Sequence, residues 1–448
     1  MSATSERNLL AFDVTHRLVL SIAIPMTLGF MTTPLLGLVD TGVVGHMGQP
    51  DALAGLAIGA MLFDLILGSF NFLRASTTGL TAQALGRHDL REQQGVFWRA
   101  FISAIACGLA LLCLSPLLLI AGLKLMGPEA GVAQATSTYF SIRILAAPAA
   151  LANYAILGFV LGRGQGTIGL ALQILINGIN IVLAIYLGLE LDWGVAGVAW
   201  GTMVGESVGA LAGLAIVLRS FKVGDRPQRA EIFSRHRLSE LFALNRDILI
   251  RTFVLIGSFA IMTRIGSSFG AVTLAANAVL MNFFLLSGYY LDGLANAAEQ
   301  ITGRAIGAAH RPAFDRGLKL TAIWSFGLAA AVSAFFFAAG PWLISVLTTS
   351  EDVRAAANTY MPWAAITGLT GALAFLMDGV FIGATWSSDM RNRMLMSLAG
   401  YLAALAVFVP LFGNHGLWLA MNAFLLFRGI FLAMLVKPRA DQTFAAAQ

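Results

Sequence analysis

The sequence predicts an all-α, polytopic membrane protein with twelve transmembrane helices in two six-helix lobes. Of the 448 residues, 58% are hydrophobic and only 11% are charged, whereas a soluble globular protein is about 45–50% apolar and about 25% charged. The apolar runs extend over about 20 residues or more, which suits spanning helices and not the roughly 10-residue alternating strands of a barrel. In addition, basic residues gather in every second loop between these runs.

Twelve apolar runs are long enough to cross a bilayer. The first six fall at about 18–46, 53–85, 95–122, 137–162, 166–189 and 194–218. The other six fall at about 245–268, 273–303, 318–338, 356–384, 394–413 and 415–436. An even number of spans places both ends of the chain on the same side of the membrane.

The charge of the loops predicts which side that is. Loops near 87–99, 219–237, 304–319 and 391–393 are rich in arginine, whereas the opposite loops near 124–129, 190–192 and 351–354 hold more acids than bases. Basic loops face the cytoplasm. We therefore expect a multi-pass, monomeric protein of the inner (plasma) membrane, in contact with the lipid bilayer and with both termini in the cytoplasm. Because the net charge of +5 comes from these loops, it predicts no nucleic-acid partner.

A long polar connection divides the chain into two similar halves. We expect an N-lobe at 1–219 with spans 1–6, a cytoplasmic linker at 220–239 and a C-lobe at 240–448 with spans 7–12. When the halves are aligned without gaps at one constant offset, identical residues pair along several helices, which indicates a duplication. Matched pairs include Leu53 and Leu274, Thr81 and Thr302, Gly86 and Gly307, Tyr139 and Tyr360, Gly158 and Gly379, and Gly162 and Gly383. Six spans per half give both lobes the same orientation, so a pseudo-two-fold axis along the membrane normal relates them, as in some transporters.

No enzyme signature is present in the sequence. It lacks an Asp-rich pair for a metal-bound pyrophosphate, a His–Glu zinc motif and a phosphate-binding loop. The two cysteines, Cys107 and Cys113, lie in one apolar run, which indicates neither a disulfide framework nor a metal site. We therefore expect no catalytic residues, no metal site and no cofactor.

Asp40 is the only acid in the first apolar run. A charged carboxylate in an apolar helix costs several kcal/mol and normally faces a partner or a wet cavity. Because burial favours the protonated form of a carboxyl group, Asp40 can take up and release a proton. Asn180 on span 5 and Thr202 on span 6 fall at a similar depth, roughly 9–15 Å below the outer surface. Asn177 lies one turn below Asn180, and Asn153 is nearer the midplane, so we expect a cluster. For Asn153 and Thr202, polar contacts between packed helices remain an alternative.

A second group of polar residues lies in the C-lobe spans. Asp292, Asn296 and Glu299 share one face of span 8, and Asp378 adds an acid in span 10. Arg74 on span 2 lies near the repeat equivalents of the span 8 residues. These residues form either a structural charge network or part of a substrate path.

Two prolines, Pro25 and Pro34, lie inside span 1. Each removes a backbone hydrogen bond and favours a kink. Beside a titratable acid, they are consistent with a helix that is straight in one state and bent in another, or with a static kink.

Six segments carry a recognisable family pattern, namely Pro34–His46, Phe72–Gln83, Leu244–Ile248, Tyr290–Ala295, Met377–Ala384 and Gly413–Trp418. Together they resemble the DinF (DNA-damage-inducible protein F) branch of the multidrug and toxic compound extrusion (MATE) transporters. The resemblance covers nearly the whole chain. It implies two lobes of six helices and cation-coupled antiport of bulky amphipathic or cationic compounds, which are small, drug-like substrates. It also implies that Asp40 is the coupling carboxylate, and that Asn180 and Thr202 belong to a cation site with Asn153 close by.

One departure from the family pattern concerns the coupling ion. Many relatives carry a second aspartate where this chain has Ala184. A sodium ion at Asp40, Asn180 and Thr202 would lose a formal charge among its ligands, whereas a proton needs one carboxylate. Glu206 could replace that charge, although we expect it to be solvated near the lipid interface. Proton coupling is therefore the first hypothesis, and sodium-coupled export is the alternative.

A lipid-linked precursor flippase of the same superfamily is a further hypothesis. It requires a large basic cavity, and the spans contain few arginines, namely Arg74, Arg143, Arg264 and Arg428. A membrane-embedded enzyme is a third possibility, which the missing catalytic residues disfavour.

Overall fold

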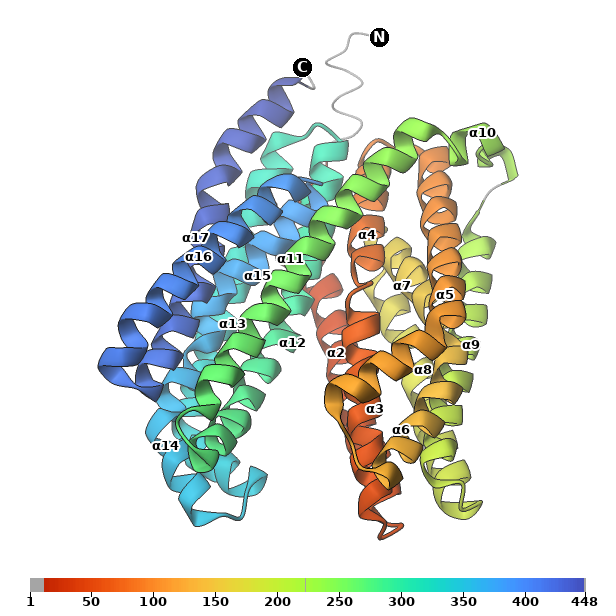
Figure 1. Cartoon of the computed structure of the whole chain (residues 1–448). Helices are drawn as coiled ribbons and strands as arrows, with labels where there is room; N and C mark the ends of the chain where they lie inside the picture. The colour runs from red at the N-terminus through yellow and green to blue at the C-terminus, as the bar shows by residue number, and fades with distance from the viewer. Residues whose placement is uncertain (1–11, 222, 447–448) are drawn as a thin grey trace, which may run out of the picture. The chain divides into compact units, whose positions relative to one another are not determined.

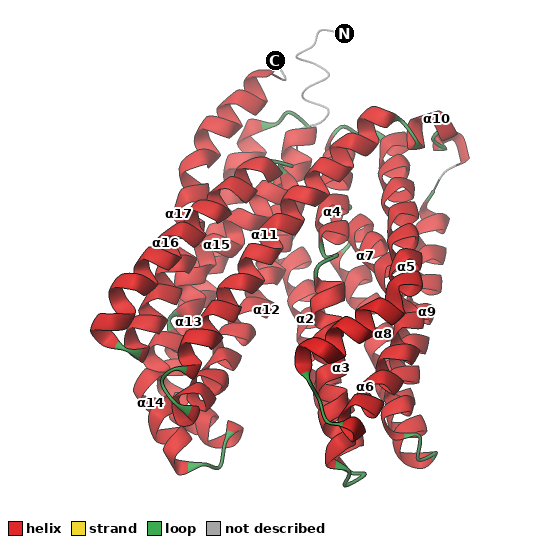
Figure 2. Ribbon diagram, viewed as in Figure 1, coloured by secondary structure: helices red, strands yellow, loops and turns green. Residues whose placement is uncertain are grey.

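The computed structural model describes residues 12–221 and 223–446, and within them it contains helices and no strands (Figures 1 and 2). Residues 1–11 of the predicted N-lobe, 222 of the linker and 447–448 of the C-lobe lie outside this description. Twelve helical segments of the described chain are long and apolar enough to cross a membrane. The predicted all-α class and the number of spans are therefore confirmed.

The helices of the first half follow the predicted order of spans. They are α2 (His16–Gly45), α3 (Pro50–Gly68), α4 (Phe72–Gly86), α5 (Leu90–Met126), α6 (Ala130–Arg143), α7 (Ala147–Gly162), α8 (Gly166–Ile185) and α9 (Gly194–Ser220). The short α10 (Arg229–Ile232) follows. The second half contains α11 (Arg235–Ser267), α12 (Ala271–Gly307), α13 (Arg311–Leu347), α14 (Glu351–Ala365), α15 (Thr367–Gly383), α16 (Ser387–Phe412) and α17 (Asn414–Ala446).

Several helices extend beyond the apolar runs that predicted them. The third span begins at Leu90 and not at 95, because Asp89 caps it by accepting a hydrogen bond from the Glu92 backbone N–H at 2.8 Å. It ends at Gly127, which takes the left-handed conformation with φ 58°. An apolar run marks only the part of a helix inside lipid, whereas caps set its ends. For the same reason the seventh span begins at Arg235, inside the predicted linker.

Three spans are interrupted where the sequence predicts continuous runs. The second span breaks after Gly68 at Ser69, whose hydroxyl donates to the Leu65 carbonyl at 2.7 Å, and Gly/Ser pairs are a known cause of kinks. The fourth span tightens into a 3₁₀ turn at Ile144–Ala146, just before Pro148. The tenth span breaks between α14 and α15 at Ile366.

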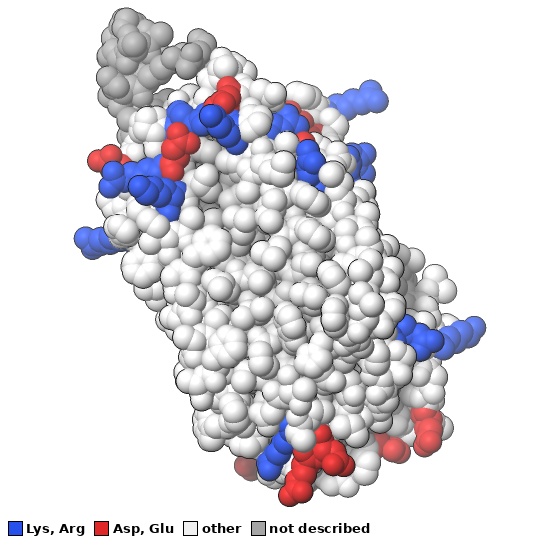
Figure 3. Space-filling model, turned by 90° about the vertical axis from the view of Figure 1, so that its left-hand side faces the viewer, with Lys and Arg blue, Asp and Glu red and all other residues white. Residues whose placement is uncertain are grey.

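The outward surface is apolar, as a bilayer requires. Large side chains such as Leu38 (70% exposed), Leu117 (65%) and Leu211 (69%) point away from the protein interior. The face seen in Figure 3 carries a broad band without charged atoms, and its Lys, Arg, Asp and Glu side chains gather toward the two ends. Large exposed apolar surfaces of this kind mark membrane contact.

The helix boundaries repeat with the same offset that aligns the two halves of the sequence. Pro50–Gly86, Leu90–Met126 and Ala130–Gly162 in the first half correspond to Ala271–Gly307, Arg311–Leu347 and Glu351–Gly383 in the second. Non-glycine residues with positive φ also recur at this offset, at His88 (56°) and Ala309 (50°). The two halves therefore share local structure as well as sequence.

Close helix contacts recur at the same positions. A Cβ on Gly158 would lie 2.5 Å from the Arg74 carbonyl oxygen, and one on Gly379 would lie 2.2 Å from the Ala295 carbonyl oxygen. These equivalent glycines let α7 approach α4 and let α15 approach α12. In each half the fourth span, which contains this glycine, is the most buried of the six.

The packing divides the described chain into two compact units. One comprises residues 12–27, 86–88 and 243–446, and the other comprises 28–85 and 89–242. Helix α2 contributes to both. The predicted lobe boundaries at 219 and 239, and the axis that relates the lobes, stay predictions.

The glycine contacts predict a stability difference between two substitutions. Gly158→Ala places a methyl group against the Arg74 carbonyl, so we expect it to destabilise the protein by about 1–3 kcal/mol. Gly178→Ala is the matched control, because a Cβ there meets nothing within 4 Å and alanine favours a helix by about 0.5–1 kcal/mol over glycine. Thermal unfolding in detergent measures both, and equal midpoints would contradict the close approach.

Candidate functional site

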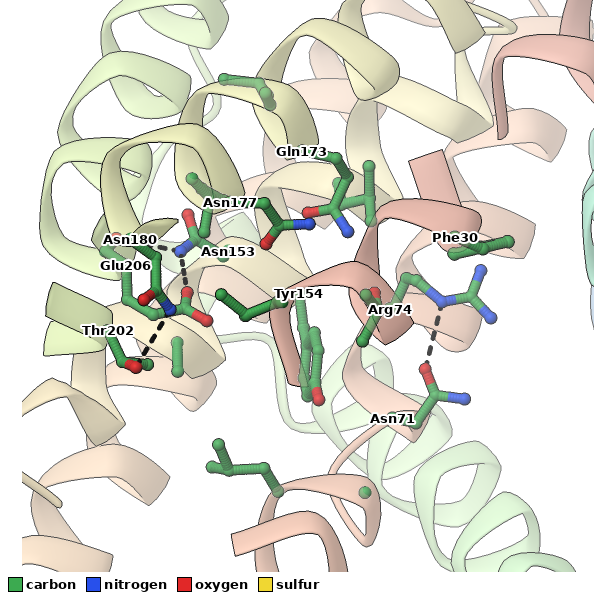
Figure 4. A pocket seen from close by; sticks show the side chains of 18 of the residues that line it. Phe30, Asn71, Arg74, Asn153, Tyr154, Gln173, Asn177, Asn180, Thr202 and Glu206 are labelled. Carbon is green, nitrogen blue, oxygen red and sulfur yellow. Dashed lines mark hydrogen bonds between the residues drawn. The ribbon is translucent and has the colours of Figure 1, made fainter. Parts of the chain in front are cut away.

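The unit formed by residues 28–85 and 89–242 contains a cavity of about 330 Å³. Helices α2, α3, α4, α6, α7, α8 and α9 line it (Figure 4). Its polar lining residues are Thr33, Asp64, Asn71, Arg74, Arg143, Asn153, Tyr154, Gln173, Asn177, Asn180, Thr202 and Glu206. Leu36, Leu67, Leu157, Leu172 and other apolar side chains complete the wall. The cavity can therefore hold a small amphipathic molecule and supply it with both hydrogen-bond donors and acceptors.

Asn180 and Thr202 form a buried hydrogen-bonded pair in this cavity. The Asn180 amide donates to the Thr202 hydroxyl oxygen at 3.0 Å, and these side chains are only 1% and 4% exposed. Glycines on α9 bring the two helices together, since a Cβ on Gly205 would lie 2.7 Å from the Ile176 carbonyl. The Asn180 Oδ1 atom has no hydrogen-bond partner among the described residues. The pair thus leaves one buried acceptor available.

Asn153 and Glu206 form a second pair on the same wall (Figure 4). The Asn153 amide donates to the Glu206 carboxylate at 2.6 Å and to its backbone carbonyl at 3.0 Å. The expectation that Glu206 is solvated near the lipid interface is therefore wrong. Gly205 and Gly209 pack this part of α9 against Ile176, and Glu206 itself lines the cavity.

Asn177 connects α8 to α2. Its amide donates to the Thr32 hydroxyl at 2.5 Å, and Thr32 lies on the turn before Pro34. Helix α2 is assigned as one continuous helix through Pro25 and Pro34. Bending of this helix at either proline stays a prediction.

Asp40 is buried on α2, with 8% of its surface exposed. Its Oδ1 atom has no hydrogen-bond partner among the described residues. The following turn packs inward, because Val43 belongs to the same buried cluster as Ala184 and Val198. Asp40 is therefore buried within the described chain, and its place in a cluster with Asn180 and Thr202 stays a prediction. It is not among the residues that line the cavity, and no hydrogen bond in the described chain joins it to Asn180 or Thr202.

Two charged residues that were not predicted to belong to the site also line the cavity. Arg143, the last residue of α6, donates to the Tyr139 hydroxyl at 2.6 Å. Its guanidinium lies 4.7 Å from the centre of the Phe63 ring. Asp64 on α3 lines the same cavity. Arg143 and Asp64 are charged residues inside apolar runs, and this feature of the sequence could have identified them as candidates for the site.

The residues predicted for a C-lobe network separate into two places. Asp378 accepts hydrogen bonds from Arg251 and, at 2.8 Å, from Arg428. On the same unit the Asn296 amide donates to the Asp292 backbone carbonyl at 2.7 Å, and Glu299 is buried.

Arg74, in contrast, lies in the cavity of the other unit, where it donates to Asn71 at 3.1 Å. These contacts favour a structural charge network as the role of Asp378. They also show that Arg74 does not belong to that network.

Within the described chain, no three His, Cys, Asp or Glu side chains lie close enough together to hold a metal ion. The oxygens of Asp40 and Asn180 that lack partners are acceptors only, and either a proton or a monovalent cation would satisfy them.

Twelve membrane-spanning helices, of which several in the first half line a mixed polar and charged cavity, are typical of a membrane transporter. The family model MatE matches residues 25–186 and again residues 248–409, so the chain belongs to the MatE family. The chain is 35% identical over 419 residues to DNA damage-inducible protein F of Escherichia coli (strain K12), in an alignment that covers 92% of this chain and 90% of the relative. The predicted resemblance is therefore confirmed.

More distant relatives show the same fold. The chain is 24% identical over 383 residues to a probable multidrug resistance protein NorM of Bacillus anthracis, covering 81% of this chain and 80% of the relative. A solved structure described as an outward-facing multidrug resistance MATE family transporter aligns with a TM-score of 0.87 and 17% identity over 99% of both chains. The family and its members are transporters, not enzymes.

The Asn180–Thr202 pair predicts a difference between two conservative changes. Thr202→Val removes the hydroxyl and leaves the buried Asn180 amide without its acceptor, so we expect a loss of about 1–3 kcal/mol in unfolding free energy. Thr202→Ser keeps the oxygen and serves as the control. Thermal unfolding of the purified variants compares them, and a valine variant as stable as the serine variant would show that the bond contributes nothing.

Proposed function

We propose that this protein is a proton-coupled antiporter that exports bulky amphipathic or cationic toxic compounds across the inner membrane by alternating access. Membership of the MatE family supports export of small molecules, and a relative at 24% identity is named as a probable multidrug resistance protein. The basic loops support cytoplasmic termini. The observation that carries the proposal is the buried carboxyl group of Asp40, which has an oxygen without a partner among the described residues.

A proton can satisfy the unpaired oxygen of Asp40 without any additional ligand from the protein. A protonated Asp40 becomes a hydrogen-bond donor, and the orphaned Asn180 Oδ1 is an acceptor on a neighbouring helix. Sodium would need several oxygen ligands and a compensating charge, and Ala184 supplies neither. Glu206 and Asp64 are the acids of the cavity that could supply that charge, and one oxygen of Glu206 already accepts a hydrogen bond from Asn153. These points favour a proton and leave sodium as the alternative.

Helix α2 is the proposed moving element. It carries Asp40 and both prolines, and the Asn177–Thr32 hydrogen bond connects it to the cavity wall. Protonation of Asp40 from the outside removes its charge and turns its carboxyl group into a hydrogen-bond donor. The outer part of α2 then rearranges, the cavity collapses and the substrate leaves. Deprotonation toward the cytoplasm resets the helix.

Asp40→Asn tests the coupling. The amide has nearly the same shape but cannot exchange a proton, so we expect efflux of a fluorescent cationic probe from proteoliposomes to fall at least about tenfold under an imposed proton gradient. Asp192→Asn is the matched control, because Asp192 lies in the loop after α8 and outside the cavity. Full transport by Asp40→Asn would refute the mechanism.

The coupling ion is tested with the native protein and the same probe. We expect a proton gradient without sodium to drive efflux, and a sodium gradient at equal pH on both sides to drive none. The reverse result would establish the sodium-coupled alternative.

A further inference from the structure

Arg143 is a fixed cation inside the cavity. Its guanidinium donates to the Tyr139 hydroxyl and lies over the Phe63 ring. Tyr139 is itself only 1% exposed and packs against Gly59, where a Cβ would lie 2.4 Å from its ring. Arg143 lies where α6 passes through a 3₁₀ turn into α7. The surrounding structure therefore holds this charge in place.

Acids on three different helices act on this cation. Asp64 on α3 and Glu206 on α9 line the same cavity, and Asp40 on α2, which lies outside that lining, also interacts with Arg143 electrostatically. The titratable and charged groups that interact with Arg143 or share its cavity are Asp40, Asp64, Arg74, Tyr139, Tyr154 and Glu206. Helix α8 contributes only the neutral amides of Gln173, Asn177 and Asn180.

When all of the acids are ionised, the groups that line the cavity balance, because the carboxylates of Asp64 and Glu206 oppose the guanidinium groups of Arg74 and Arg143. The buried carboxylate of Asp40, which lies outside that lining and interacts with Arg143, adds one net negative charge, and the tyrosines are neutral. In surroundings of low polarity an unbalanced charge is costly. One proton or one monovalent organic cation restores neutrality, whereas a dication would leave one net positive charge.

We propose that Arg143 is a specificity-determining residue that sets the cavity to accept monovalent organic cations in preference to divalent ones. Without Arg143 the same acids would leave two net negative charges, and a dication would then fit the balance better. The inference rests on the proposed use of this cavity for cationic substrates. It does not depend on which ion drives transport.

A matched pair of cations tests this proposal by binding alone. N-methyl-4-phenylpyridinium carries one positive charge and methyl viologen carries two, on rigid two-ring frames of similar size. Their dissociation constants are measured by calorimetry on the purified full-length protein in detergent at pH 8, without any gradient. For the native protein we expect tighter binding of the monocation.

Substitutions at Arg143 separate charge from packing. In Arg143→Gln we expect the ratio of the two dissociation constants to shift by about tenfold in favour of the dication. Loss of the arginine removes a repulsion that acts on every positive charge of the ligand, so the dication gains twice as much binding energy as the monocation. Arg143→Lys keeps the charge and should stay within about twofold of the native ratio. Arg163→Gln, outside the cavity and bonded to Ser220, is the control for loss of an arginine and should leave the ratio unchanged.

Glu206→Gln provides a second test that does not require Arg143→Gln to fold. It removes one negative charge, so we expect the ratio to shift about tenfold in the opposite direction, toward the monocation. The proposal is overturned if the ratios in the two variants do not move in opposite directions. It is also overturned if the native protein binds neither probe. If Glu206→Gln alone folds, an unchanged ratio in that variant overturns it. Charge-selective binding without proton-driven efflux would instead contradict the proposed coupling and leave this inference standing.

Discussion

The balance of buried charge is the constraint on which the functional part of this structure depends. An ion among apolar helices is stable only beside a partner of opposite sign or a polar network. The cavity meets this requirement with Arg143 beside Asp64 and Glu206, and the buried Asp40 also interacts with Arg143 electrostatically. Amide side chains such as Asn153 provide further hydrogen bonds. Because the groups balance collectively, a change in the charge of one of them, by protonation or by a bound cation, alters the stability of all.

Close packing makes this arrangement possible. Glycines on α9 let α8 approach within backbone contact distance, which brings Asn180 and Thr202 together. Small residues have this role in membrane helices generally, since lipid offers no hydrophobic force to hold helices together. The breaks after Gly68 and at Ile144 also adjoin residues of the cavity, Asn71 and Arg143. Irregular backbone at membrane depth is tolerated where it lines a cavity.

The fold could be predicted from the sequence more fully than the site. Composition and the length of apolar runs determine the number of spans, but they mark only the lipid-crossing part, so capped extensions such as that at Asp89 were missed. Depth along each span placed Asp40, Asn180 and Thr202 at one level, with Asn177 one turn below and Asn153 nearer the midplane. All of these residues except Asp40 line one cavity. Depth does not give the rotation of a helix about its axis. For that reason the inward direction of Glu206 and the position of Arg74 in the first-half cavity required the structure.

The two halves also show how a duplicated fold acquires different uses. Leu157 lines the cavity of the first half, and its repeat equivalent in the second half is Asp378. Phe30 also lines that cavity, and its equivalent is Arg251, which pairs with Asp378. Arg428 completes this second network. Apolar wall residues in one half thus correspond to a bonded ion pair in the other. Two arginines already compensate the charge of Asp378, whereas Asp40 retains an oxygen without a hydrogen-bond partner among the described residues. The backbone repeat is therefore preserved while the polar and charged residues at equivalent positions differ between the two halves.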